Sequence, residues 1–111
     1  MFEQYIKSGR ETLEYLRKYR EIAVAVKEIA KGDYEGVKAY VFGSTVKGEF
    51  TASSDIDILL VLNEVDKEEA TELKAKILRR MGFRVPLQIH VATQSEFEEW
   101  YLKFIDELMP V

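Results

Sequence analysis

The stretch YVFGSTVKGEFTASSDIDILLVL, Tyr40 to Leu62, places two acids, Asp55 and Asp57, at the start of an apolar run. Side chains alternate between the two faces of a strand, so an extended chain here points both carboxylates to one face. Two anions that close repel each other, and a cation between them removes the repulsion. Mg²⁺ takes one or two protein carboxylates together with substrate phosphates and water. The pair of acids therefore predicts a magnesium site of the kind that binds a nucleotide.

The loop before these acids carries the residue types that phosphates need. Gly43 and Ser44 directly follow the strand-like segment 37–42, and a turn there can present backbone N–H groups and a hydroxyl to an anion. Lys47 adds a positive charge in the same loop. We therefore predict nucleotide binding at Gly43, Ser44 and Lys47. The alternatives are an ordinary turn serine at Ser44 and a solvated loop lysine at Lys47, and the second of these is the commoner case.

Composition narrows the class of protein. The 111 residues fit one domain, expected to span 1–111, and no repeat or linker divides them. The absence of cysteine excludes disulfides and thiolate metal sites, and fits a reducing compartment. The net charge of −4 argues against a broad nucleic-acid-binding face. We expect a cytoplasmic protein, because no apolar stretch could span a membrane and residues 1–10 lack the apolar core of a signal peptide.

Hydrophobic periodicity predicts six elements in the order α-β-β-α-β-α. The first helix is expected to follow a break or kink near Gly9, and Asp66 with Glu69 in capping-box spacing begins the second. Ser95, with an acid three residues later, introduces the last helix. The expected helices lie at about 12–30, 66–81 and 96–108, and the strands at 37–42, 55–62 and 84–92.

These residues carry a resemblance. The pair Gly43-Ser44, ten intervening residues and Asp55-Ile56-Asp57 within apolar sequence resemble the signature of the DNA polymerase β-like nucleotidyltransferase superfamily. Length and element order are similar to those of its minimal members from bacteria and archaea. The resemblance covers most of the chain and implies an α/β (α+β) nucleotidyltransferase fold, with helices packed on a small mixed sheet. It also implies that the glycine-serine loop holds the phosphates of ATP, and that Asp55 and Asp57 are catalytic, metal-binding carboxylates.

The chain departs from this family where the third metal-binding carboxylate is expected. The corresponding strand reads VPLQIHV, with Gln88 at the position of the acid. An amide oxygen can coordinate a metal, but it supplies no charge and cannot act as a general base. His90, two residues later on the same face, is a candidate stand-in as ligand or base. A second departure is Thr45, where many relatives carry a basic residue soon after the serine, and Lys47 is the candidate replacement.

The resemblance implies a Mg²⁺-dependent nucleotidyltransferase that transfers AMP from ATP to a protein hydroxyl. Minimal nucleotidyltransferases are commonly paired, as antitoxins, with a small helical HEPN-domain toxin, and some modify a tyrosine of that toxin. A catalytically weakened or inactive antitoxin or nucleotide-binding module is the first alternative, favoured by Gln88. A small-molecule nucleotidyltransferase is the second.

The last predicted helix carries a wide aromatic stripe. Together with tyrosines of the first helix, this stripe exceeds what so small a domain easily buries. It is therefore a candidate surface for a protein partner or for a second copy of the chain. The aromatic residues of the stripe are Phe97, Trp100, Tyr101 and Phe104.

Overall fold

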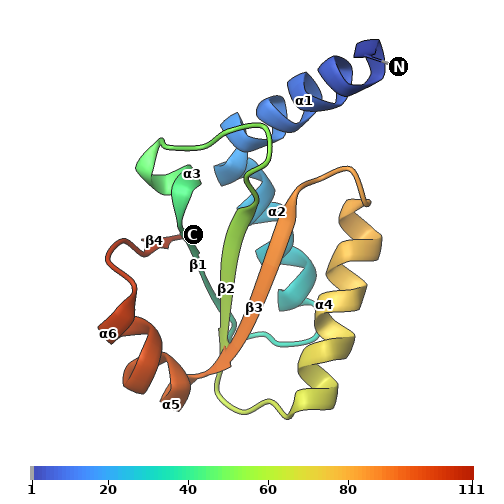
Figure 1. Ribbon diagram of the computed structural model, residues 1–111. Coiled ribbons are helices and arrows are strands. Elements are labelled where there is room, and N and C mark those ends of the chain that lie inside the picture. Colours follow the sequence, from blue (N-terminus) through green and yellow to red (C-terminus); the bar gives the residue numbers. More distant parts are fainter. Residues whose placement is uncertain (1) are drawn as a thin grey trace.

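Four strands of the computed structural model, which describes residues 2–111 and side chains from residue 8 onward, pair into one mixed sheet (Figure 1). The strands are β1 (Lys38–Phe42), β2 (Ile56–Leu62), β3 (Leu87–Thr93) and β4 (Met109–Pro110). Their spatial order is β3-β2-β1-β4, in which β1 pairs antiparallel with β2 and β4, and β2 runs parallel to β3. The mixed sheet that the resemblance implies is therefore confirmed.

Helices connect these strands and lie on both faces of the sheet. The longer helices are α1 (Phe2–Arg17), α2 (Tyr19–Lys31) and α4 (Lys67–Met81), and the short helix α3 (Ser44–Lys47) follows β1. A C-terminal helical segment consists of α5 (Gln94–Glu96), the π-helical turn η1 (Phe97–Tyr101) and α6 (Leu102–Phe104). Figure 1 shows α4 and the C-terminal helical segment on opposite sides of the strands.

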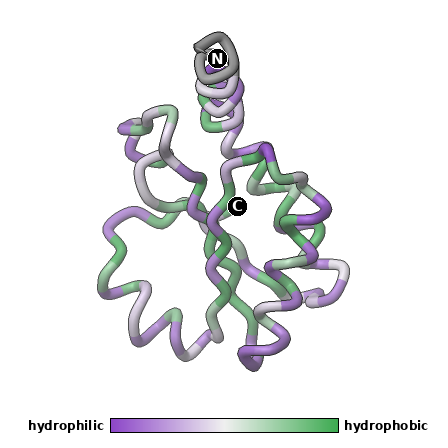
Figure 2. The backbone as a smooth tube through the Cα atoms, turned by 45° about the vertical axis from the view of Figure 1, so that its right-hand side comes forward, coloured by the Kyte–Doolittle hydropathy of each residue, from purple (hydrophilic) through white to green (hydrophobic). Residues whose placement is uncertain are grey.

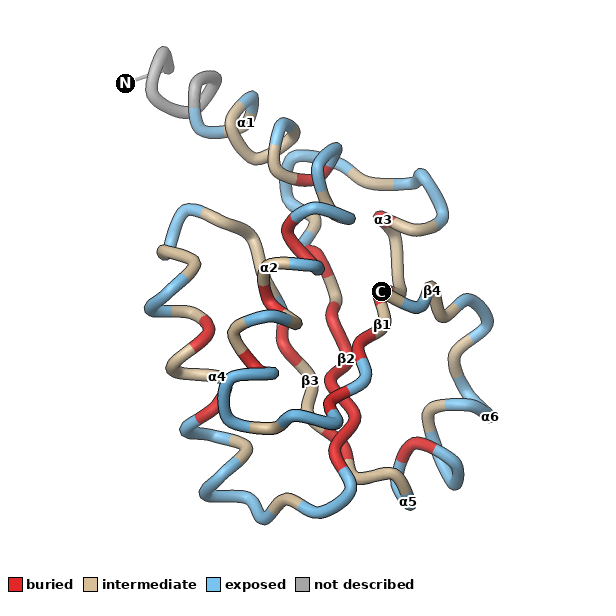
Figure 3. Tube along the Cα trace, turned by 180° about the vertical axis from the view of Figure 1, so that it is seen from behind, coloured by how far each residue is buried: buried red, intermediate tan, exposed pale blue. Residues whose placement is uncertain are grey.

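Strand β2 is the centre of the fold, because every residue in it except Asp57 is buried. Side chains alternate along β2, so it contributes to two separate cores. Figure 2 shows the hydrophobic residues concentrated in the central strands, and Figure 3 shows the same strands buried. One core, shared with α1, α2 and α4, contains Ile56, Ile58 and Leu60 of β2. The other, shared with the C-terminal helical segment, contains Leu59, Val61, Ala92 and Phe97.

The first helical region differs from its prediction. The expected break near Gly9 is wrong, because α1 runs through this residue and ends at Arg17. A Cβ at Gly9 would lie 3.6 Å from the Cβ of Ala52, so the glycine lies where the loop before β2 packs against α1. The break falls instead at Lys18, whose φ of −96° and ψ of 22° depart from helical values. Two helices therefore replace the one expected over 12–30.

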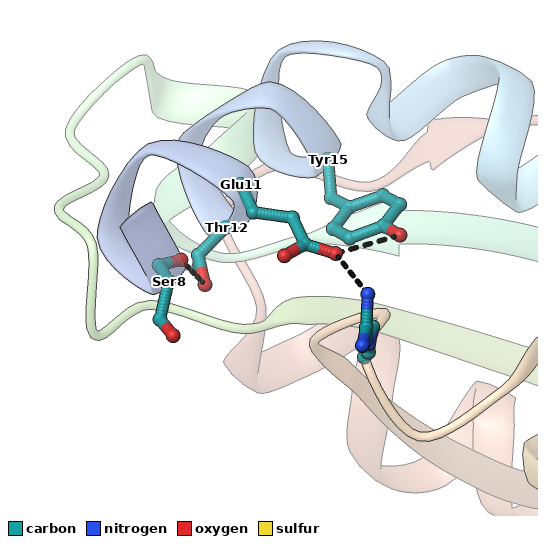
Figure 4. A network of polar contacts seen from close by, with 5 residues as sticks. Ser8, Glu11, Thr12 and Tyr15 are labelled. Atoms are coloured by element: carbon teal, nitrogen blue, oxygen red, sulfur yellow. Dashed lines mark hydrogen bonds and ion pairs between the residues drawn. The ribbon is translucent and has the colours of Figure 1, made fainter. Parts of the chain in front are cut away.

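Polar contacts on α1 connect this helix to the segment before β3 (Figure 4). The hydroxyl of Tyr15 donates to Glu11 Oε1 at 3.5 Å, and Arg84 Nη1 lies 3.6 Å from the same oxygen. Thr12 Oγ1 donates to the carbonyl of Ser8 at 2.9 Å, as threonines within helices often do. The Arg84 side chain is largely exposed, so this ion pair adds little stability.

The C-terminal region also differs from its prediction. The N-cap is Thr93 instead of Ser95, because Thr93 Oγ1 accepts from the N–H of Glu96 at 3.1 Å and Glu96 Oε1 accepts from the N–H of Thr93 at 3.0 Å. Helical structure ends at Phe104 instead of residue 108, since Ile105 is extended. The chain then returns to β1 as β4, which satisfies backbone groups at that edge. The expected order α-β-β-α-β-α therefore lacks α3, β4 and the break between α1 and α2.

The remaining boundaries agree more closely with the sequence. The strand expected at 55–62 begins one residue later, and the strand expected at 84–92 is found at 87–93. The capping box of α4 is confirmed: Asp66 Oδ1 accepts from the N–H of Glu69 at 2.8 Å, and Glu69 Oε1 from the N–H of Asp66 at 3.2 Å. Over residues 2–111, no helix is long and apolar enough to cross a membrane.

Replacing Asp66 by Ala removes the acceptor at the start of α4, which orders the chain between β2 and β3. We expect the free energy of unfolding to fall by about 1 kcal/mol. Urea unfolding followed by circular dichroism measures the change, and Glu64→Ala, at an exposed acid two residues earlier, is the matched control. Equal stability of the two variants would contradict the capping role.

Candidate functional site

Gly43 links β1 to α3 in a backbone conformation that residues other than glycine do not readily adopt. Its φ is +83° and its ψ is −157°, a region used almost only by glycine. A Cβ built on Gly43 would lie 2.6 Å from Oδ2 of Asp57, closer than two such atoms can approach. The backbone of the glycine-serine turn is therefore in direct contact with the Asp57 carboxylate. The structure thus brings together two features that the sequence separates.

Asp57 lies in the sheet with a neighbour on each side. It is opposite Phe42 of β1 and opposite Gln88 of β3. Its side chain is 23% exposed, and Oδ1 lies 3.3 Å from Nε2 of His90. The two carboxylate oxygens therefore have different neighbours, His90 at Oδ1 and Gly43 at Oδ2.

Asp55 lies one residue before β2 and is exposed. The loop that leads to it is fixed by its own hydroxyl groups: Ser54 Oγ accepts from the N–H of Thr51, and Thr51 Oγ1 lies 3.3 Å from Ser53 Oγ. Asp55 and Asp57, the first exposed and the second partly buried, offer two hard oxygen groups as donors. This set suits Mg²⁺, which keeps several water or phosphate ligands when it binds to one or two carboxylates.

The residues after Gly43 form the short helix α3 and differ in how far they are buried. Ser44 is half-buried and is the first residue of the helix, and Gly48 ends it with a φ of +72°. Thr45 is buried, and its Oγ1 has no hydrogen-bond partner in the part of the chain that the structure describes. A basic side chain at Thr45 would therefore point into the protein. Lys47 is exposed and lies 4.0 Å, Nζ to Oδ2, from the exposed Asp106.

Gln88 and His90 lie in β3, next to β2. They are two residues apart, so the alternation of side chains puts them on the same face. Gln88 is exposed and lies opposite Asp57, so the position expected for a third carboxylate is at the site but is neutral. Among the residues that the structure describes, no three Asp, Glu or His side chains lie close enough together to hold a metal ion. Within the described side chains, no acid from another element therefore replaces the missing one.

Phe42 is the site residue that sequence reasoning missed. It was expected only as part of a strand, but its ring lies 5.0 Å from the ring of His90 and is tilted by 55° to it. The alternation of side chains would have placed Phe42 on the face of Asp57 if the antiparallel pairing of their strands had been known.

Residues 14–108 match the family model of the nucleotidyltransferase domain. The chain belongs to this nucleotidyltransferase family. The resemblance and the fold that it implies are thereby confirmed. A predicted protein adenylyltransferase of Methanocaldococcus jannaschii is 40% identical over 63 residues, which cover 52% of this chain and 62% of that protein. The nucleotidyltransferase described here thus spans less than two thirds of that relative's length.

Solved structures agree with the family assignment. A crystal structure of a predicted nucleotidyltransferase has a TM-score of 0.64 and 30% sequence identity, over 78% of this chain and 94% of that one. A predicted nucleotidyltransferase from Sulfolobus solfataricus has a TM-score of 0.56 and 21% identity, over 95% and 83% of the two chains. At that identity the second comparison supports the fold alone.

Replacing Gly43 by Ala should damage this nucleotidyltransferase in two ways. The unfavourable backbone conformation costs about 1–3 kcal/mol of stability. The new Cβ also displaces the Asp57 carboxylate, so the affinity for Mg²⁺ should fall. Chemical denaturation and Mg²⁺ titration calorimetry measure the two effects.

Gly48→Ala is the matched control, because Gly48 also has a positive φ but a Cβ there would meet no atom within 4 Å. The control should lose stability and keep its metal affinity. If both variants bind Mg²⁺ as the native protein does, the contact between Gly43 and Asp57 has no role in the site.

Proposed function

We propose that this protein is a Mg²⁺-dependent nucleotidyltransferase that transfers AMP from ATP to a hydroxyl group of another protein. The observation that carries the proposal is the contact between the Gly43 backbone and the Asp57 carboxylate. It puts a turn suited to phosphates beside an acid suited to the metal that accompanies them. The name of the Methanocaldococcus relative, a predicted protein adenylyltransferase, supports the adenylyl group and the protein acceptor.

Each residue of the site has a role in this proposal. The N–H groups and hydroxyl of the Gly43-Ser44 turn hold the triphosphate, and Lys47 neutralises part of its charge. Asp55 and Asp57 hold Mg²⁺, which when bound offsets the negative charge that builds up on the phosphates. Lys47 must exchange Asp106 for a phosphate group, and an exposed ion pair of this kind is worth only about 0–1 kcal/mol.

In the proposed reaction, the hydroxyl oxygen of the acceptor bonds to the α-phosphorus as the bond from phosphorus to the pyrophosphate oxygen breaks. The pyrophosphate leaves, and the hydroxyl proton passes to water, because the Gln88 amide cannot take it. The protein contributes position and charge and forms no covalent intermediate.

The proposed acceptor is a tyrosine of a small helical HEPN-domain partner, for which this protein acts as antitoxin. The resemblance to minimal nucleotidyltransferases supports this partner. Exposed apolar side chains of the C-terminal helical segment support docking of a protein rather than of a small molecule. These side chains are those of Trp100, Leu102 and Phe104.

A second candidate function is a nucleotide-binding antitoxin with weak or no catalysis. The observation that favours it is the exposed, neutral Gln88 opposite Asp57. Two carboxylates bind less Mg²⁺ charge than three do. With less positive charge next to the phosphates, the α-phosphorus is less activated.

Replacing Asp57 by Asn should abolish Mg²⁺-dependent binding of ATP, because the site loses one of its two carboxylate charges and keeps only the exposed Asp55. Titration of ATP into the protein, with Mg²⁺ and with EDTA, measures this by calorimetry. Asp33→Asn, at an exposed acid that follows α2 and pairs with Lys76 of α4, is the control and should bind as the native protein does. Unchanged binding by the Asp57 variant would refute the metal site.

Replacing Gln88 by Glu should raise the rate of AMP transfer to the partner, since it restores a third carboxylate opposite Asp57. Transfer of labelled AMP from ATP to the partner protein measures the rate. An increase of tenfold or more, equal to about 1.4 kcal/mol of barrier, would identify the native protein as a weakened enzyme. If neither form transfers AMP while both bind the partner, the second candidate function is the correct one.

A further inference from the structure

Within the described residues, His90 is the side chain that forms a polar contact with Asp57. The distance from Nε2 to Oδ1 is 3.3 Å, and the two side chains are 28% and 23% exposed. The residues come from adjacent parallel strands, where Leu59, not Asp57, is the direct neighbour of His90. The imidazole therefore reaches diagonally along the face toward the carboxylate.

The imidazole ring is itself supported from the opposite side of β2. The ring of Phe42 lies 5.0 Å away, centroid to centroid, and Phe42 is the β1 residue opposite Asp57. Phe42 and His90 thus meet across the central strand, next to the acid. A ring with a packed neighbour loses less conformational freedom when it forms its hydrogen bond.

The Asp57 carboxylate is consequently fixed at both oxygens. Oδ1 accepts from His90, and Oδ2 lies against the backbone of Gly43, where even a Cβ would not fit. Rotation of the carboxylate would break the first contact and force the second. Side chains that orient a metal ligand in this manner typically change metal affinity 10–100-fold when they are removed.

We propose that His90 is a positioning residue, which donates its Nε2–H to Asp57 and holds this carboxylate in the orientation that binds the metal. The inference rests on the proposed function. His90 thereby contributes to a site in which Gln88 adds no charge. His90 acts through Asp57 and is not itself a ligand.

The test is binding of Mn²⁺, as a probe for Mg²⁺, to the full chain, measured by the electron paramagnetic resonance signal of free Mn²⁺ with and without ATP. His90→Leu should weaken Mn²⁺ binding about 10–100-fold. His90→Gln, whose amide N–H lies near the position of Nε2, should recover most of the affinity. Lys38→Leu, at an exposed position of β1, is the control and should bind as the native chain does. Thermal unfolding confirms that each variant is folded.

If the leucine variant does not fold, His90→Asn replaces it in the test. The shorter asparagine amide cannot reach Oδ1, so this variant should bind Mn²⁺ as weakly as is predicted for His90→Leu. Native affinity in His90→Leu or His90→Asn, with binding lost in Asp57→Asn, would overturn the positioning role and leave the proposed function intact. Coupling of bound Mn²⁺ to an imidazole nitrogen, seen by pulsed resonance, would make His90 a ligand and also overturn it. Absence of Mn²⁺ and ATP binding in the native chain would instead remove the proposed function itself.

Discussion

The antiparallel register between β1 and β2 is the constraint on which the site depends. It places Phe42 opposite Asp57, so that the turn at Gly43 begins beside the acid. A shift of one residue would turn Asp57 toward α1, α2 and α4 and Ile58 toward the opposite face of the sheet. Burial of Ile56, Ile58 and Leu60 against α1, α2 and α4 resists such a shift. The same apolar contacts that stabilise the fold therefore also fix the geometry of the functional residues.

The second face of the sheet is divided into an apolar end and a polar end. At the apolar end, Phe97 stacks on Tyr40 with ring centroids 4.9 Å apart, and the C-terminal helical segment covers the strands. At the other end the same strands present Asp57, Gln88 and His90, which are not buried. A carboxylate within a central strand is tolerated here because it remains partly exposed, so the cost of removing its charge from water is lower than for full burial.

Local patterns in the sequence predict the parts of this structure that depend on local interactions. The capping box at Asp66, the apolar run of β2 and the special turn at Gly43 each depend on a few consecutive residues. The break at Lys18 has no glycine or proline to mark it. Thr93 and Ser95 each have an acid three residues later, so both are candidates for the N-cap of the last helical segment. The parallel pairing with Leu62 extends β3 as far as Thr93, and the helical segment therefore begins directly after Thr93. The contact of His90 with Asp57 and Phe42 likewise requires the strand order, which periodicity does not reveal.

Strand β4 has a consequence for how the protein is made. The carbonyl of Val111 accepts from Lys27 Nζ at 2.7 Å, and the N–H of Val111 donates to the carbonyl of Ala39 at 2.9 Å. On a ribosome, β1 emerges about seventy residues before Met109, Pro110 and Val111, the residues that pair with it. Until then one edge of β1 remains open to other strands, including those of neighbouring nascent chains. The strand that leads into Gly43 thus gains its second neighbour long after it is made, and its open edge is a site for aggregation during synthesis.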